Sequence, residues 1–183
     1  DKVGQEIVAP SITIIDDATM TDGLASRPFD AEGVQSSPVT VIENGVLKTY
    51  ICDSYSARRL GTKVTGNAGR GYASAPNTGS SNLFIKNGSA NPKDIIKSVK
   101  NGLYLMEMFG SGVNSVTGDF SQGATGFWIE NGEITYPVQE ITIAGNVLKV
   151  LKNVQAIGND LSFKLGTTAS PTLLISEMTV GGE

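Results

Sequence analysis

The chain of 183 residues carries 14 Lys and Arg and 18 Asp and Glu side chains, which give a net charge of -4. This length is close to the ~150 residues of a typical domain, so we expect residues 1–183 to form a single domain with its own hydrophobic core. The basic residues form no block, and phosphate binding requires clustered Lys and Arg, so a nucleic-acid partner is not expected. No apolar run approaches the ~20 residues of a membrane-spanning helix, and the lone cysteine, Cys52, excludes an internal disulfide. We therefore expect a cytoplasmic protein without a membrane partner.

The tetrapeptide Ile-Glu-Asn-Gly occurs twice, at residues 42–45 and 129–132. Each copy lies between two β-prone runs, and both residues of a two-residue type I′ turn need a positive φ, which Asn-Gly adopts readily. The sequence therefore predicts two β-hairpins, spanning Val39 to Tyr50 and Phe127 to Tyr136.

Three short helices are expected, at residues 53–61, 91–100 and 146–154. The first is capped by Asp53 or Ser54 and ends at Gly61, while the second begins with an Asn-Pro pair that suits the cap and first helical position. Gly102 is interpreted as the left-handed stop of the second helix. In the third helix, apolar residues recur on one face.

The remaining strands are expected at Ser11–Ile15, Leu103–Phe109, Asn114–Phe120, Gly126–Glu130, Asp160–Lys164 and Thr172–Ser176. Leu103–Phe109 is apolar on both faces, which predicts a central strand covered on both sides. Because strands outnumber helices and neighbours are joined by tight turns, we expect an α+β fold with a mostly antiparallel sheet, hairpins and three short helices.

The chemistry-bearing residues exclude several kinds of active site. There is no histidine, so the chain itself offers no Ser-His-Asp or Cys-His arrangement and no histidine zinc ligand. Cys52 is interpreted as a small buried hydrophobe and Trp128 as a core or sheet-face residue. A set of acidic residues lacks the spacing of a calcium loop and is interpreted as turn chemistry; it comprises Asp16, Asp17, Asp22, Asp30 and Glu32. No catalytic residue and no metal ligand is assigned.

Three polar segments flanked by glycines, at residues 65–69, 112–126 and 157–160, are candidates for binding a substrate or a partner. Short polar side chains beside glycines leave backbone groups accessible to an extended peptide that adds as a strand. The alternative is that these segments are capped turns and bulges. The candidate residues are Thr65, Asn67, Asn114, Thr117, Asp119, Ser121, Asn159 and Asp160.

Several long motifs carry a resemblance to a known family. They are SRPFDAEG, ENGVLKTYICDSYSARRLGTKVTGNAG, NLFIKNG and SVTGDFSQGATGFWIENGEITYPVQEITIAGN, followed by IGNDLSF and PTLLISEMTVGG. Together they cover essentially the whole chain. The sequence resembles the C-terminal region of the TldD/PmbA family.

This resemblance implies a cytosolic peptidase of two subunits that trims or degrades unfolded peptides, in a family also labelled as modulator of DNA gyrase. In the family, the TldD-type subunit carries zinc on an H-E-x-x-x-H helix and on a cysteine that follows a Gly-Asn-Asp-Leu motif. Here the chain runs from Asn159 to the last strand without a cysteine, and FWIENG and DSYSARRLG are similar to the PmbA, or TldE, type. The resemblance thus implies a non-catalytic TldE/PmbA-type subunit of a heterodimer, without a cofactor of its own, whose TldD-type partner holds the zinc.

Two other functions stay open. In the first, the chain is a self-sufficient hydrolase, for example one using Ser121 with a lysine. In the second, it is a regulatory module that binds another protein such as gyrase. Because one of these alternatives is a hydrolase, whether the chain is itself an enzyme is left open. Assembly into a homo-oligomer is a further alternative to the heterodimer.

Overall fold

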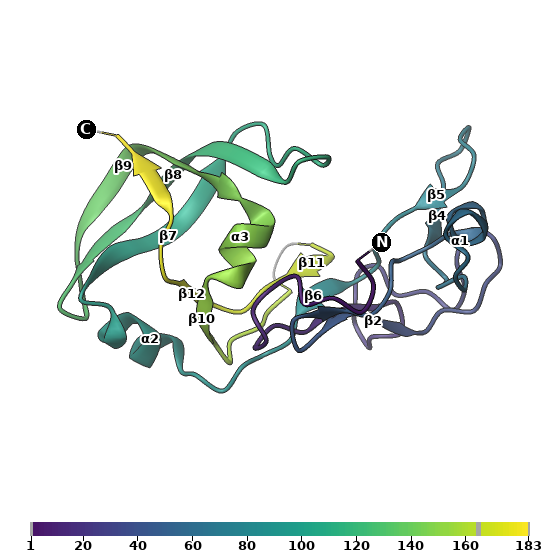
Figure 1. Ribbon diagram of the computed structural model, residues 1–183, viewed down its shortest axis with the longest axis horizontal. Helices are drawn as coiled ribbons and strands as arrows, with labels where there is room; N and C mark the ends of the chain where they lie inside the picture. Colours follow the sequence, from purple (N-terminus) through teal and green to yellow (C-terminus); the bar gives the residue numbers. More distant parts are fainter. Residues whose placement is uncertain (1, 164–165, 183) are drawn as a thin grey trace. The chain divides into compact units, whose positions relative to one another are not determined.

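The computed structural model describes residues 2–163 and 166–182 (Figure 1). Two compact units are present: the first comprises Asp1–Lys86 and Leu161–Pro171, and the second comprises Asn87–Asp160 and Thr172–Glu183. The expectation of a single domain stays a prediction. The α+β class is confirmed, because three short helices accompany sheets that are antiparallel in all but one strand pair of the described chain.

The first unit contains a five-stranded sheet of order β11-β6-β1-β2-β3, a small ribbon β4-β5 and one helix. Only the β11-β6 pair of the described strands is parallel. The bounds are β1 Ile14–Asp17, β2 Pro38–Glu43, β3 Val46–Leu47, β4 Ala68–Gly69, β5 Asn77–Thr78, β6 Leu83–Ile85, β11 Thr168–Ala169 and α1 Ser54–Leu60.

Local turn and cap signals of the first unit are confirmed. Asn44 and Gly45 have φ values of 49° and 83° and join β2 to β3 in the predicted two-residue hairpin. Asp53 accepts a hydrogen bond from the backbone N–H of Ser56 and caps α1, which ends at Gly61 with a φ of 64°. These features depend only on adjacent residues and their side chains.

The interior of the first unit is held partly by carboxylates. Asp16 is 1% exposed and accepts hydrogen bonds from Asn67 Nδ2, from the Ser81 backbone N–H and from Ser81 Oγ, at 2.6, 2.7 and 2.8 Å. This carboxylate therefore ties β1 to two later loops. The prediction that Asp16 serves a turn is wrong, because Asp16 lies within β1 and its partners are distant in the sequence.

Asp30 plays a similar part in the same unit. Its carboxylate accepts from the backbone N–H groups of Glu32, Val34 and Ala68. Burial raises the pKa of Asp30, but these three hydrogen bonds and the nearby Arg27 outweigh it, so the pKa lies below its ordinary value. Asp30 thus fixes its own turn and the start of β4.

Cys52 is fully buried and directly precedes Asp53, the residue that caps α1. Burial, followed by the neighbouring charge of Asp53, raises the pKa of its thiol. The interpretation of Cys52 as a small buried residue is confirmed.

The second unit is built on a four-stranded antiparallel sheet of order β13-β9-β8-β7, in which β8 and β9 form a long, strongly bent hairpin (Figure 1). A separate pair, β10-β12, and two helices complete it. The bounds are β7 Asn101–Phe109, β8 Asp119–Glu130, β9 Glu133–Asn146, β10 Val154–Ile157, β12 Leu173–Ile175, β13 Thr179–Gly181, α2 Pro92–Ser98 and α3 Val147–Lys152.

The core of this sheet centres on Ala124, Ile141 and Ile143, which are nearly inaccessible to solvent. Partly buried hydrophobic residues pack against them, namely Leu103, Leu105, Phe120, Val138 and Met178.

The second hairpin is confirmed, since Asn131 and Gly132 have φ values of 50° and 84° between β8 and β9. Trp128 lies in β8 and is partly buried.

The predicted central position of Leu103–Phe109 is wrong. These residues belong to β7, which is an edge strand of its sheet, and its last residues are largely exposed, with Met106 at 56% and Phe109 at 53%. An apolar pattern on both faces predicts burial, but it does not specify which strands pair on either side. The composition was correct for a strand and misleading for its place in the sheet.

The strand predicted at Asn114–Phe120 is wrong for residues 114–118, which form a turn, while Asp119 and Phe120 open β8. The Asn114 side chain accepts from the backbone N–H groups of Val116 and Thr117, and Gly118 takes a φ of 81°. A short polar side chain that binds its own backbone competes with strand pairing. β8 consequently runs unbroken through the predicted strand Gly126–Glu130.

The boundaries of two predicted helices also require correction. Asn91 caps α2 as expected, but the helix ends at Ser98, where Val99 is extended, and Gly102 lies in β7 without a positive φ. Strand pairing of Asn101 with Glu130 replaces the expected helix stop.

The third helix ends at Lys152, and Val154 opens β10. Residues 160–163 form no strand, contrary to the predicted Asp160–Lys164, while Lys164 itself lies outside the described residues. The predicted strand at Thr172–Ser176 is confirmed as β12.

Candidate functional site

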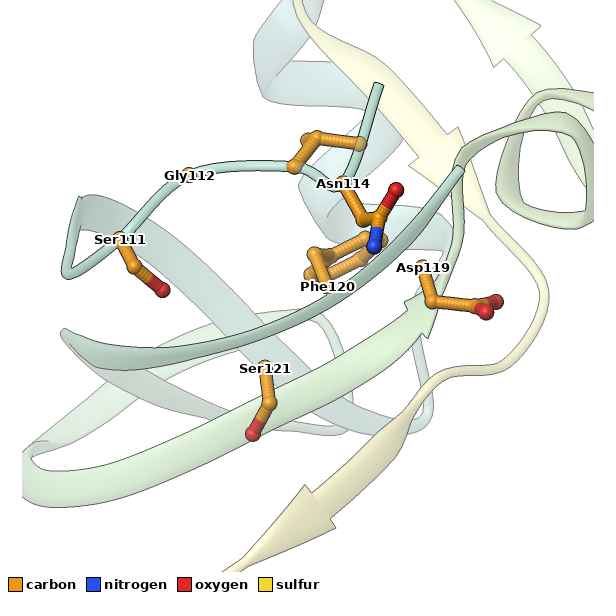
Figure 2. Close-up of a pocket in the computed structure, with 7 residues that line it drawn as sticks. Ser111, Gly112, Asn114, Asp119, Phe120 and Ser121 are labelled. Atoms are coloured by element: carbon orange, nitrogen blue, oxygen red, sulfur yellow. The ribbon is translucent and has the colours of Figure 1, made fainter. Parts of the chain in front are cut away.

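The segment between β7 and β8 borders an open pocket of about 460 Å³ in the second unit (Figure 2). An isolated bridge between Val113 and Phe120, and a hydrogen bond from the Asn114 N–H to the Asp119 carbonyl oxygen, fold the segment back on the start of β8. The lining residues are Ser111, Gly112, Val113, Asn114, Asp119, Phe120 and Ser121. The pocket volume is within the ~300–1,000 Å³ range of ligand sites.

The turn beside the pocket leaves several polar groups available. Asn114 uses its Oδ1 to accept from Val116 and Thr117, at 2.9 and 3.1 Å. Its Nδ2, and the hydroxyl groups of Ser111 and Ser121, make no hydrogen bond within residues 2–163 and 166–182. These groups can therefore bind a ligand without breaking an internal interaction.

Asp119 is the one charged residue of the lining, and its carboxylate points away from Ser111 and Ser121 (Figure 2). Its Oδ1 accepts from Asn146 Nδ2 at 2.9 Å, and Asn146 in turn caps α3 by accepting from the Leu148 N–H. Hydrogen bonds from Asn146 and Thr117, together with the charge of Lys149, lower the pKa of Asp119. The carboxylate is therefore ionised at neutral pH.

Four of the sequence-predicted site residues come together here. Asn114, Asp119 and Ser121 line the pocket, and Thr117 belongs to the turn beside it. Asn159 and Asp160 lie elsewhere in the second unit, where the Asp160 carboxylate accepts from the N–H and the hydroxyl of Thr172.

The two remaining candidates belong to the first unit. Thr65 Oγ1 accepts from the Cys52 N–H at 2.7 Å and donates to the Cys52 carbonyl at 3.1 Å. Asn67 is 1% exposed and donates to Asp16, so its side chain serves the interior of the unit. A binding role for any of the eight residues stays a prediction.

The sequence reasoning missed Asn146, Ser111 and Phe120 as members of this site. Asn146 was expected only as the start of a helix, although it also donates to Asp119 and to the Thr117 carbonyl oxygen. Its proximity follows from the pairing of β8 with β9, which places Asp119 opposite Asn146. A residue pair separated by 27 positions carries no local signal.

The residues of this chain do not fit zinc. Zinc in proteins is bound by Cys, His and carboxylate ligands, yet the sequence has no histidine and Cys52 is buried with a raised thiol pKa. No group of three or more His, Cys, Asp and Glu side chains gathers anywhere in the described ranges.

None of the helices in the described residues is long and apolar enough to cross a membrane.

The α+β chain matches, over residues 1–182, a family profile described as the PmbA/TldA metallopeptidase C-terminal domain. The chain belongs to the PmbA/TldD family, and the resemblance seen in its motifs is confirmed.

Curated relatives match along the whole chain. Metalloprotease PmbA of Escherichia coli O157:H7 is 39% identical over 183 residues, which is 100% of this chain and 38% of that protein. A TldD homolog of Haemophilus influenzae is 32% identical over 196 residues, covering 99% of this chain and 41% of that protein. The chain thus spans about two fifths of the length of these relatives.

Solved structures agree with the family. TldE from Thermococcus kodakarensis superposes with a TM-score of 0.89 at 30% identity, covering 99% of this chain and 42% of that one. A Thermotoga maritima protein described as a candidate modulator of a DNA gyrase gives a TM-score of 0.89 at 36% identity, with 98% and 41% covered.

Proposed function

We propose that this chain is the C-terminal part of a non-catalytic TldE/PmbA-type subunit, which acts in the cytoplasm with a TldD-type subunit on unfolded peptides. In this proposal zinc, and the chemistry that it supplies, belong to the TldD-type subunit. The subunit containing this chain contributes polar groups and strand edges to an extended substrate.

The lengths of the alignments favour the TldE/PmbA type of subunit over the TldD type. The match to metalloprotease PmbA occupies 183 positions for the 183 residues of this chain. The matches to two TldD homologs occupy 195 and 196 positions, so those relatives contain at least twelve positions that this chain lacks. The PmbA relative is also more similar, at 39% identity against 31% and 32% for the two TldD homologs.

Two features of the second unit favour a role in holding peptide. The outer edge of β7 has no strand partner in the part of the chain that the structure describes, so its backbone groups can pair with an added strand. The pocket lined by Asn114 and Ser121 adds polar side chains with free hydrogen-bonding capacity.

The test is native mass spectrometry of the full-length protein, alone and mixed with a TldD-type chain from the same genome, with zinc content and cleavage of an unfolded peptide measured in parallel. We expect a complex of the two chains in which zinc and peptidase activity both require the TldD-type chain. A zinc-loaded, active oligomer of the full-length protein alone would overturn the proposal.

A regulatory role is the second candidate, because a structure 36% identical to this chain is described as a candidate modulator of a DNA gyrase. This function requires binding to gyrase from the same genome at micromolar concentration. An interaction measurement with purified gyrase that gives no binding in that range would remove it. A hydrolase using Ser121 gains no support, because the Ser121 hydroxyl is not hydrogen-bonded to any lysine in the described chain.

A further inference from the structure

We propose that α1 and the loop between β4 and β5 form a docking face for an acidic, concave surface of the TldD-type subunit. This inference rests on the function proposed above and adds the surface through which the two subunits meet. All residues of this basic face are exposed and belong to the first unit, and they are Tyr55, Arg58, Arg59, Leu60, Lys63, Arg70 and Tyr72.

The basic face is positively charged within an acidic chain. Residues 54–93 contain no Asp or Glu, although the whole chain has 18 acidic side chains and a net charge of -4. The four Lys and Arg residues of the face all fall in this stretch. The carboxylate of Glu32 lies at the start of α1, where the N–H and hydroxyl of Ser54 bind it, and it offsets part of the charge. The face therefore attracts a negatively charged surface, and such complementarity steers the association of protein partners.

The loop between β4 and β5 extends from a base that buried groups hold in place (Figure 1). Asp30 holds β4, because its carboxylate accepts from the Ala68 N–H at 2.9 Å. Thr78 holds β5 against the start of α1, since its Oγ1 accepts from the Asp53 N–H at 3.2 Å and lies 3.3 Å from Ser56 Oγ. Loop and helix thus form one surface, and binding residues on a rigid scaffold are positioned more precisely than mobile ones.

The tip of this loop presents a tyrosine. Residues 70–76 are all exposed, and Tyr72 is fully so. The Gly71 N–H donates to Ser74 Oγ at 2.9 Å, and the Ser74 N–H donates to the Gly71 carbonyl oxygen at 3.5 Å, so a tight turn holds Tyr72. A side chain ordered before binding loses less entropy in a complex. Tyrosine is also among the residues that contribute most to protein interfaces.

α1 adds a second tyrosine, which is already paired with an arginine. The guanidinium carbon of Arg59 lies 5.8 Å from the centroid of the Tyr55 ring, and Arg59 Nη1 donates to the Tyr55 hydroxyl at 3.2 Å. Leu60, the last residue of the helix, is 56% exposed and adds apolar surface. The face thus combines aromatic and arginine side chains, both of which are enriched at interface hot spots.

The shape and charge of the basic face select the kind of partner. A projecting loop requires a concave surface, which a folded subunit offers and an extended peptide does not. A second copy of this chain bound through the same face would bring two positive surfaces together, and like charges disfavour such an isologous contact. Four basic residues also neutralise few phosphates, which disfavours nucleic acid. The TldD-type subunit is therefore the partner assigned to this face.

The experiment measures the affinity and association rate of the full-length protein with the TldD-type chain from the same genome, by biolayer interferometry at several salt concentrations. Tyr72→Ala should weaken the complex about tenfold or more, because it removes the anchor of the loop. The double variant Lys63→Glu, Arg70→Glu should slow association about tenfold at low salt and reduce its salt dependence.

Two variants of the second unit are matched controls. Tyr136→Ala removes a tyrosine that is 51% exposed in β9, and Lys93→Glu reverses the charge of an exposed lysine in α2. Both should bind the TldD-type chain like the wild type. Thermal unfolding of every variant checks that it is folded.

Hydroxyl-radical footprinting identifies what covers Tyr72. We expect Tyr72 to react in the full-length protein alone and to be protected in the mixture with the TldD-type chain. Protection in the full-length protein alone would mean that another part of the same chain covers the face, and it would overturn the inference.

The other outcomes separate this inference from the proposed function. Unchanged affinity in folded Tyr72→Ala and double-variant proteins, or an equal loss in the two controls, would overturn the docking face and leave the complex of the two subunits standing. Binding of a single-stranded oligonucleotide that is lost in the double variant, with the subunit complex unaffected, would also overturn it. Absence of any complex with the wild-type protein would count against the proposed function, and the inference would fall with it.

Discussion

Replacement of Asp16 by asparagine is expected to lower the free energy of unfolding by about 3 kcal/mol. The carboxylate is 1% exposed and accepts three hydrogen bonds, from Asn67 Nδ2 and from the N–H and hydroxyl of Ser81. Asparagine has a single acceptor oxygen, so its NH₂ group would face one of these donors. A buried donor left without a partner costs ~1–3 kcal/mol, and more when the lost partner is charged.

Asp22→Asn is the control for this prediction. Asp22 is exposed and has a φ of 62°, a conformation that asparagine also tolerates, so this variant should stay within ~0.5 kcal/mol of the wild type. Chemical denaturation followed by circular dichroism measures both variants. A loss at Asp16 no larger than the loss at Asp22 would show that the buried network contributes little to stability.

Replacement of Gly126 by alanine is expected to cost at least ~3 kcal/mol. Gly126 lies in β8 opposite Leu105 of β7 and Val138 of β9. A Cβ atom there would overlap the Tyr104 carbonyl oxygen, and it would lie 3.2 Å from the Leu105 Cα. Because these obstacles are backbone atoms, relief requires the two strands to separate, which disrupts the sheet beside the core.

Gly181→Ala is the matched control in the same sheet. Gly181 lies in β13, and apart from its own chain neighbours no atom of the described residues lies within 4 Å of the Cβ that alanine would add. This change should leave the midpoint of thermal unfolding nearly unaltered, whereas Gly126→Ala should lower it by many degrees or prevent folding. Similar midpoints for the two variants would mean that β7 and β8 are not paired as described.

The turns, the helix starts and the family could all be predicted from residues that are close together in the sequence. Asn44-Gly45 and Asn131-Gly132 form the predicted hairpin turns because a positive φ is a property of these two residues and not of their surroundings. Asp53 and Asn91 cap helices for the same reason, since each side chain bonds to a backbone N–H only two or three residues away. The long motifs then indicated the family without reference to any contact in space.

The order of the strands and the composition of the site follow only from contacts between segments that are distant in the sequence. β7 has the composition of a central strand and lies at an edge, because strand order depends on pairing between distant segments. Asn67 was a candidate for binding and is bound to Asp16, 51 residues away. Asn146 joins Asp119 only through the register of β8 and β9. Local preferences act over a few adjacent residues, whereas burial, register and the meeting of side chains in a pocket arise only when the whole chain packs.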